Sequence, residues 1–359
     1  MWWQTQAACL VSPDIAKTFM TTTTWQPPAS AGITHITPHS AVSPDGWIFT
    51  EERGSGFNGA SMWNVTTNEH VRIRKFANPQ TYQAAGGFNG RYVLWQETHN
   101  LETFDDFHMY IYDLAKGKQR DLGPNGTDAD GNPYFSPLDP PEVQDGYGMW
   151  VMGSGKDRRD VKVVDLASGQ VRTLVSGAIN GAHLDEGVVT VTYADRRHEQ
   201  FDVTSGSKVT QPWVHEFDGL SMVTFGADWA AAVDEQTGND LWFKRSPDAP
   251  TELILHLDGD HSFQNAPQRD GRFLVYPDDG HGAFALDLTT SILFQVADPL
   301  LSFENGNEFV SIPRSEDKAA PTTKFILRTV DPDKLTPDLC ADPRPAPTPT
   351  TDGAGISQA

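Results

Sequence analysis

The chain has 359 residues, of which 48 are Asp or Glu and 27 are Lys or Arg, so its formal net charge is -21 and its pI is near 4.7. Nucleic acids and anionic membranes attract basic surfaces, and this excess of acidic residues therefore argues against both as partners. No apolar run reaches the roughly 18 residues of a membrane span, which predicts the absence of a transmembrane segment.

The chain begins with an extension, residues 1–16, that lacks the basic start and the apolar core of a secretory signal peptide. Residues 17–25 follow, and their run of Thr with Phe, Met and Trp is β-prone. The local sequence offers this strand no partner of its own. Because an unpaired strand leaves its backbone groups open, we expect it to complete a sheet formed by a distant part of the chain.

One short pattern recurs along the chain: an apolar residue, Asp or Asn, Leu or Val, two small or polar residues, and often Gly. An Asp or Asn side chain before a tight turn accepts hydrogen bonds from amides two residues on, and Gly takes the positive φ that a hairpin needs. The pattern therefore predicts the hairpin between the two outer strands of a repeated unit. Its copies are residues 63–68, 112–117, 164–169, 201–206 and the weaker 286–290.

A second pattern, an acidic residue or Asn followed by Gly and a β-prone run, precedes these hairpins. It is typical of the turn between the innermost strand of a unit and the next strand. A fifth unit has an irregular sequence, with its turn at residues 226–229 and its outer strands at 241–245 and 251–255. The regular copies are residues 45–49, 89–95, 145–151, 186–189 and 270–275, with a seventh candidate at 305–310.

Seven such units of about 40–45 residues predict an all-β protein, a seven-bladed β-propeller that occupies residues 17–340 as one domain. The seventh unit lacks an outer strand after Val330, and we expect residues 17–25 to supply it as an N-terminal strand of the closing blade. A six-bladed ring with the last unit packed outside is the alternative. The tail, residues 341–359, is rich in Pro and Thr and is expected to be disordered.

The hairpins and the Asp-Gly turns between residues 30 and 330 resemble the repeats of bacterial TolB-like and YncE-like β-propeller proteins. This resemblance concerns the fold. Propellers with such repeats bind proteins or sugars, hydrolyse or eliminate, so the resemblance implies no single function.

The two cysteines, Cys9 and Cys340, stand near opposite ends of the chain. In a propeller both ends meet in the closing blade, so a Cys9–Cys340 disulfide would staple the ring and stabilise it by about 4–5 kcal/mol. Such a bond indicates an oxidising compartment and would favour a secreted or extracytoplasmic location. Two unpaired cysteines are the alternative.

Ligands of a propeller are expected where the central channel opens, near the beginnings of the innermost strands and the loops between second and third strands. Histidines are frequent at these positions, where they could bind a divalent metal or act beside Glu as a general base. For any one histidine, a local hydrogen-bonding role is the competing interpretation. The residues predicted for catalysis are His183, His261 and Glu304, and those predicted for ligand binding are His39, Gln83, Glu97, His99, Glu142, Arg158, Arg197, His215, Phe263, Gln264, Asn265, Asp278 and His281.

Diagnostic catalytic motifs are absent, among them Gly-x-Ser-x-Gly, His-Glu-x-x-His and the P-loop. The sequence favours a monomeric enzyme or small-ligand-binding protein that acts at the channel mouth, by elimination, hydrolysis or cyclisation of a small molecule. The alternative is a non-catalytic, extracytoplasmic propeller that binds a protein, a glycan or a component of the cell envelope.

Overall fold

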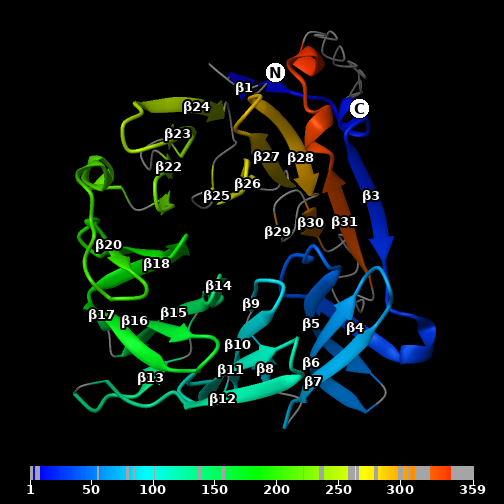
Figure 1. Cartoon of the computed structure of the whole chain (residues 1–359), viewed down its shortest axis with the longest axis vertical. Coiled ribbons are helices and arrows are strands. Elements are labelled where there is room, and N and C mark those ends of the chain that lie inside the picture. The colour runs from blue at the N-terminus through cyan, green and yellow to red at the C-terminus, as the bar shows by residue number, and fades with distance from the viewer. Residues whose placement is uncertain are drawn as a thin grey trace, which may run out of the picture.

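The structure is a computed structural model that describes residues 3–4, 9–54, 56–77, 81–83, 86–100, 102–128, 130–135, 137, 139–154, 158–220, 222–233, 238–257, 263, 267–278, 282–297, 302–305, 308–311 and 324–340. Within these ranges the strands form seven β-sheets that follow one another around a ring (Figure 1). The protein is therefore an all-β, seven-bladed propeller, and the six-bladed alternative is wrong. No helix in the described part of the chain is long and apolar enough to cross a bilayer.

The first three blades are antiparallel sheets whose strands run in chain order from the centre of the ring outwards. In the second and third blades the innermost strand is split into two short strands on the same neighbour. The first blade has β4 (Ile33–Pro38), β5 (Trp47–Gly54), β6 (Phe57–Asn64) and β7 (His70–Lys75). The second has β8 (Tyr82–Gln83), β9 (Gly87–Phe88), β10 (Tyr92–Thr98), β11 (Phe107–Asp113) and β12 (Lys118–Pro124). The third has β13 (Tyr134–Phe135), β14 (Glu142–Gln144), β15 (Tyr147–Ser154), β16 (Arg158–Asp165) and β17 (Val171–Gly177).

The last four blades repeat this plan with shorter strands. The fourth has β18 (Ile179–Asp185), β19 (Val188–Tyr193) and β20 (His198–Asp202). The fifth has β21 (Val223–Phe225), β22 (Ala230–Val233), β23 (Asp240–Lys244) and β24 (Thr251–Leu257). The sixth has β25 (Gln268–Asp270), β26 (Phe273–Asp278), β27 (Gly282–Asp287) and β28 (Ile292–Ala297). The seventh has β29 (Ser302–Asn305), β30 (Glu308–Ser311) and β31 (Phe325–Val330).

The predicted hairpins form through local chemistry. The Asn64 side-chain oxygen accepts hydrogen bonds from the amides of Thr66 and Thr67, at 3.0 and 2.9 Å. Gly169, which closes the corresponding hairpin of the third blade, has a φ of 75°, a conformation that other residues rarely adopt. Each outer hairpin is therefore specified by a few neighbouring residues, which explains why the repeat can be recognised in the sequence.

The fourth blade has three strands in the described chain, whereas the irregular fifth unit has four strands of its own. A 3-10 helix, η2 (Pro212–Phe217), follows β20 where a fourth strand would begin. Pro212 has no amide hydrogen to donate to a neighbouring strand, which disfavours a strand there. Trp213, Val214 and Phe217 of this helix pack instead against Phe225 of the fifth blade, so the helix fills the junction between the two blades.

The N-terminal residues add outer strands to three consecutive blades. β1 (Trp3–Gln4) pairs antiparallel with β24, β2 (Cys9–Leu10) pairs parallel with β28, and β3 (Met20–Trp25) pairs antiparallel with β31 (Figure 1). A short helix, α1 (Pro13–Ala16), connects the last two. The prediction that residues 17–25 complete the closing blade is confirmed, and the two shorter strands before them are an addition that the sequence did not reveal.

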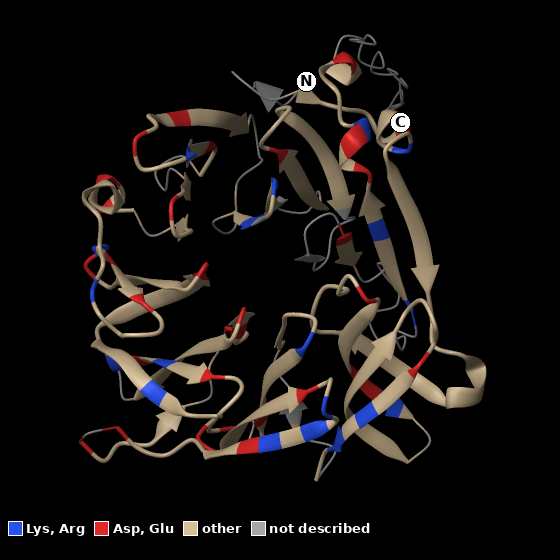
Figure 2. Ribbon diagram, in the orientation of Figure 1, with Lys and Arg blue, Asp and Glu red and all other residues tan. Residues whose placement is uncertain are grey.

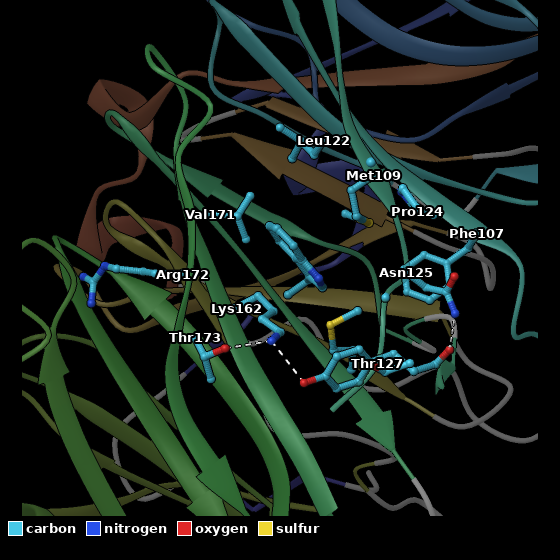
Figure 3. A pocket seen from close by; sticks show the side chains of 15 residues that line it. Phe107, Met109, Leu122, Pro124, Asn125, Thr127, Lys162, Val171, Arg172 and Thr173 are labelled. Carbon is cyan, nitrogen blue, oxygen red and sulfur yellow. Dashed lines mark hydrogen bonds between the residues drawn. The ribbon is translucent and has the colours of Figure 1, made fainter. Parts of the chain in front are cut away.

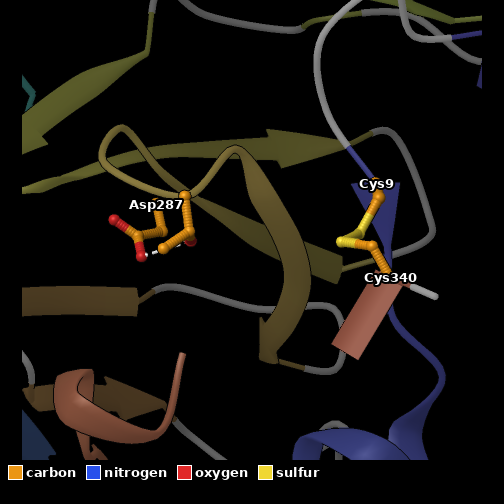
Figure 4. Close-up of a disulfide and its surroundings, with 4 residues drawn as sticks. Cys9, Asp287 and Cys340 are labelled. Carbon is orange, nitrogen blue, oxygen red and sulfur yellow. Dashed lines mark hydrogen bonds between the residues drawn. A yellow bond between two sulfur atoms is a disulfide. The ribbon is translucent and has the colours of Figure 1, made fainter. Parts of the chain in front are cut away.

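The predicted disulfide is also confirmed. It joins Cys9 in β2 to Cys340 at the end of the 3-10 helix η4 (Pro337–Cys340), with 6.0 Å between the two Cα atoms (Figure 4). The bond connects the outer edge of the sixth blade to the C-terminal end of the described chain. The ring is therefore closed twice, by strand pairing in the seventh blade and by a covalent link beside it.

Candidate functional site

Two predicted site residues, Glu142 and His183, meet between the inner strands of the third and fourth blades. Glu142 begins β14, the inner strand of the third blade, and His183 lies in β18, the inner strand of the fourth. Nδ1 of His183 donates to Oε1 of Glu142 at 3.1 Å, and Oε2 of Glu142 accepts from the backbone amide of Leu184 at 2.6 Å. The two side chains are 27 % and 33 % exposed, so solvent and small molecules can reach them.

Asp185 extends this contact to the fifth blade. Its Oδ1 accepts from Nε2 of Gln144 at 3.1 Å, and its Oδ2 accepts from the Ala227 amide and from Nε1 of Trp229, at 3.1 and 3.2 Å. Sequence reasoning missed Asp185 and Gln144. The signal that could have found Asp185 is a second acidic residue directly before the Glu186-Gly187 turn.

The surroundings of His183 favour its charged form. Burial lowers the pKa of His183, but the carboxylates of Glu142 and Asp185 raise it by more, so the pKa lies above the usual value for histidine. The imidazole therefore keeps its proton to higher pH than a free histidine does. Such a group can donate a proton or bind an anionic group near neutral pH.

The position of this cluster along the channel differs from the prediction. Glu142 pairs with Met149 and His183 with Thr190, so both lie nearer the turns between first and second strands than the beginnings of the inner strands. The reason is that β18 already begins at Ile179, and that the inner strand of the third blade is divided into β13 and β14. Glu142 begins β14, as predicted, whereas His183 lies within β18 and not at its beginning, so the predicted position is wrong for His183.

Two predicted arginines lie at the beginnings of the third strands of their blades, one in the strand and one just before it, and both contact acidic partners. Arg158 begins β16 and its Nη1 lies 3.2 Å from Oδ2 of Asp130. Arg197 precedes β20, hydrogen-bonds Glu199, and stacks its guanidinium over the Tyr193 ring at 4.4 Å from the ring centroid. The structure does not bring either arginine into contact with Glu142 or His183.

Glu97 and His99 lie in the junction between the first and second blades, apart from the contact between Glu142 and His183 in the third and fourth. Glu97 is fully buried at the end of β10, and one of its oxygens accepts from Nε of Arg74 on β7 at 2.6 Å. The other oxygen lies 3.5 Å from Nε2 of His99. The guanidinium of Arg74 also covers the Tyr110 ring, at 4.3 Å from its centroid.

His39 lies in the first blade, next to its innermost strand. It follows β4 instead of beginning it, because its amide donates to the Phe49 carbonyl at 2.8 Å, close to the turn end of the blade. The predicted position at a strand beginning is therefore wrong for this residue. Its side chain is buried beside the Phe49 ring, and Nε2 lies 4.0 Å from Oε2 of Glu51.

The stability of the protein is expected to fall between pH 6.5 and pH 4 because of His39. Burial and the neighbouring His35 lower the pKa of His39 from 6.5 to about 4. The unfolded chain therefore binds a proton in this range that the folded chain does not, and the stabilisation present above pH 6.5 is lost as the pH falls. Urea denaturation at pH 7 and pH 4.5 should show a smaller loss for His39→Gln than for the wild type, by about 2 kcal/mol. Equal losses in the two proteins would contradict this assignment.

Two further predicted residues lie apart from the cluster. His215 is in η2, outside the fourth blade, and its Nδ1 lies 3.0 Å from Oδ2 of Asp218. Phe263 is buried against the ring of Tyr276, with 4.9 Å between centroids, as ordinary packing between strands requires.

For three of the remaining predicted residues the structure gives only the strand pairing, and the other four lie outside the described residues. Gln83 pairs with Glu97, Glu304 with Phe309, and Asp278 with Gly282. Those that lie outside the described residues are His261, Gln264, Asn265 and His281.

A cavity of about 270 Å³ lies between the second and third blades, outside the channel (Figure 3). Aromatic and Met side chains are among those that line it, and Nζ of Lys162 donates to Oγ1 of Thr173 on the neighbouring strand at 2.7 Å. Nζ of Lys162 also bonds Oη of Tyr134 at 3.2 Å and Oδ2 of Asp160 at 3.0 Å. The lysine is thus fully engaged by protein groups. The sequence signal that could have pointed to this lysine is a Lys between the apolar residues of a β-prone run, 161–164.

No known protein family and no curated protein matches this chain. Among solved structures it is similar to an oligogalacturonate lyase from Vibrio parahaemolyticus, with 11 % identity and a TM-score of 0.55 over 87 % of this chain and 97 % of that one. An oligogalacturonate lyase in complex with manganese matches with 8 % identity and a TM-score of 0.52 over 87 % and 96 %. A chain of the mitotic checkpoint complex matches with 10 % identity and a TM-score of 0.51 over 86 % and 93 %. At these identities the likeness shows the class, a β-propeller, and nothing finer.

Proposed function

We propose that this propeller binds a small polar molecule in its central channel and that Glu142 and His183 act on it as an acid–base pair. The observation that carries the proposal is the 3.1 Å contact between these two side chains, contributed by two blades and open to solvent. β14 and β18 carry acidic positions at their inner ends (Figure 2), which give the region between them a negative field.

The roles of the two residues follow from their hydrogen bonds. The Leu184 amide fixes Glu142, and the carboxylate in turn orients Nδ1 of His183. In the described part of the chain no group hydrogen-bonds Nε2 of His183, so this nitrogen is the one that meets a ligand. Elimination, hydrolysis and cyclisation all need a proton transfer of this kind. Two of the similar structures are lyases, which supports an enzyme without assigning its reaction.

We further propose an extracytoplasmic location, because a disulfide links Cys9 and Cys340 and such bonds persist in oxidising compartments. The same observation favours a second candidate function, a non-catalytic propeller that binds a protein, a glycan or an envelope component. That the protein is a monomer stays a prediction. The resemblance of the repeats to TolB-like and YncE-like propellers stays a prediction about the fold.

The test uses Glu142→Gln and His183→Gln. Removal of the Glu142 charge is expected to lower the pKa of His183, which an NMR titration of the imidazole measures directly. Small polar compounds that raise the melting temperature of the wild type are then measured for binding and turnover. We expect each variant to lose at least about tenfold in affinity or turnover, since one charge-assisted hydrogen bond is worth roughly 1.5–3 kcal/mol.

His215→Gln is the matched control, because His215 also pairs with a carboxylate at 3.0 Å but lies outside the channel. This variant should bind and turn over ligands as the wild type does. Undiminished binding and turnover in both channel variants would overturn the proposal. Retention of a macromolecular partner by wild type and variants alike would favour the second candidate function.

A further inference from the structure

A group of three possible metal ligands lies at the rim of the second blade. His99 follows β10, Asp106 precedes β11, and His108 lies in β11, where it pairs with Glu97 across the sheet. The His99 amide donates to the Asp106 carbonyl at 2.7 Å, which closes the loop between the two strands. One ligand atom from each of the three side chains lies within 4.8 Å of the other two.

Each histidine of this group has a carboxylate beside one of its ring nitrogens. Oε2 of the buried Glu97 lies 3.5 Å from Nε2 of His99, and Asp121 on β12 lies 3.0 Å from Nδ1 of His108. Histidines that bind a metal usually donate their other nitrogen to a carboxylate, which fixes the tautomer and orients the ring. In this arrangement His99 would bind a metal through Nδ1 and His108 through Nε2.

The spacing and the charge suit one divalent ion. Nδ1 of His99 lies 3.5 Å from Oδ1 of Asp106, close to the about 3.4 Å that separates two ligands at tetrahedral zinc. Glu97, Asp106 and Asp121 carry three negative charges, and Arg74, which pairs with Glu97 at 2.6 Å, carries one positive charge. The difference of two is the charge that one divalent ion neutralises.

We propose that His99, Asp106 and His108 bind a first-row transition-metal dication such as Zn²⁺. Ions of this class bind imidazole nitrogens as well as carboxylates, whereas Mg²⁺ and Ca²⁺ take oxygen ligands. Two imidazoles and one carboxylate therefore suit a transition metal. The side chains of His99, His108 and Asp106 are 23 %, 25 % and 59 % exposed, so the ion can enter and exchange from solvent. The bound ion fixes the 99–106 loop to the sheet at the junction of the first and second blades.

The experiment titrates tag-free protein, first dialysed against a chelator, with Zn²⁺ by calorimetry, and counts bound metal by mass spectrometry. The wild type should bind one equivalent at the site. His99→Gln and His108→Gln should each weaken binding at least 100-fold, and Asp121→Asn, which removes an orienting carboxylate, by 10–100-fold. Asp106→Asn lies in an exposed loop and tests the site if a histidine variant does not fold.

His215→Gln is again the matched control, since His215 has a carboxylate partner but belongs to no three-ligand group among the described residues. His183→Gln tests the channel as the source of binding. Both should bind Zn²⁺ as the wild type does. Zn²⁺ should also shift the NMR signals of His99 and His108 and leave that of His215 in place. Less than half an equivalent in the wild type, or full affinity in both His99→Gln and His108→Gln, would overturn the proposal. Neither result bears on ligand binding in the channel.

Discussion

Replacement of Trp25 with alanine is expected to lower the free energy of unfolding by about 3–5 kcal/mol, the usual cost of truncating a buried tryptophan. Trp25 ends β3 and is 8 % exposed. Its ring lies 4.7 Å from that of Phe325 in its own blade and 5.4 Å from that of Trp63 in the first blade, as centroid distances. The substitution therefore removes packing at the junction where the first and last blades meet.

Trp242→Ala is the control for this prediction, because Trp242 is an exposed tryptophan, at 36 %, on β23 of the fifth blade. Urea or thermal denaturation of the two variants should show a much smaller loss for Trp242→Ala. Similar losses of unfolding free energy in the two variants would contradict the prediction that the junction between the first and last blades contributes strongly to stability.

Removal of the disulfide is expected to destabilise the protein by about 4–5 kcal/mol. Cys9 and Cys340 are 331 residues apart in the chain, so the bond restricts the unfolded state strongly. Cys9→Ser with Cys340→Ser should unfold at lower denaturant concentration than the oxidised wild type, and a reductant should bring the wild type to the level of the double variant.

The double variant is its own control, because a reductant has no bond to break in it and should leave its stability unchanged. Mass analysis of the wild type under non-reducing and alkylating conditions measures whether the bond is formed. An oxidised wild type whose stability does not respond to reductant would contradict the assigned contribution of the bond.

Much of the fold could be predicted because its signals are local. The Asn64 hairpin needs one side chain and two amides that follow it, and the Gly residues of the turns mark positive φ without reference to the rest of the chain. The closing strand and the disulfide followed from one global statement, that the two ends of a ring meet. Prediction of the fold thus required only the repeats and the fact that a ring brings its two ends together, and a single sequence shows the repeats.

The site could be predicted less well because it depends on how neighbouring blades align. Glu142 and His183 were both named, but their contact arises from the offset between β14 and β18, which no local pattern encodes. The division of the inner strand of the third blade into β13 and β14 shifted the expected positions. His108 was not named as a site residue, because its proximity to His99 depends on the exact length of the 99–106 loop.

The pairing of β3 with β31 bears on how the protein is made. Met20 pairs with Val330, so β3 leaves the ribosome long before β31 and has no partner until β31 has been synthesised. Such distant pairing slows folding, because the entropy of a very long loop must be overcome first. During synthesis the edge of β3 is open to pairing with other chains. The threonines Thr21 to Thr24, which are exposed in the folded protein, make the unpaired strand polar and so less prone to aggregate.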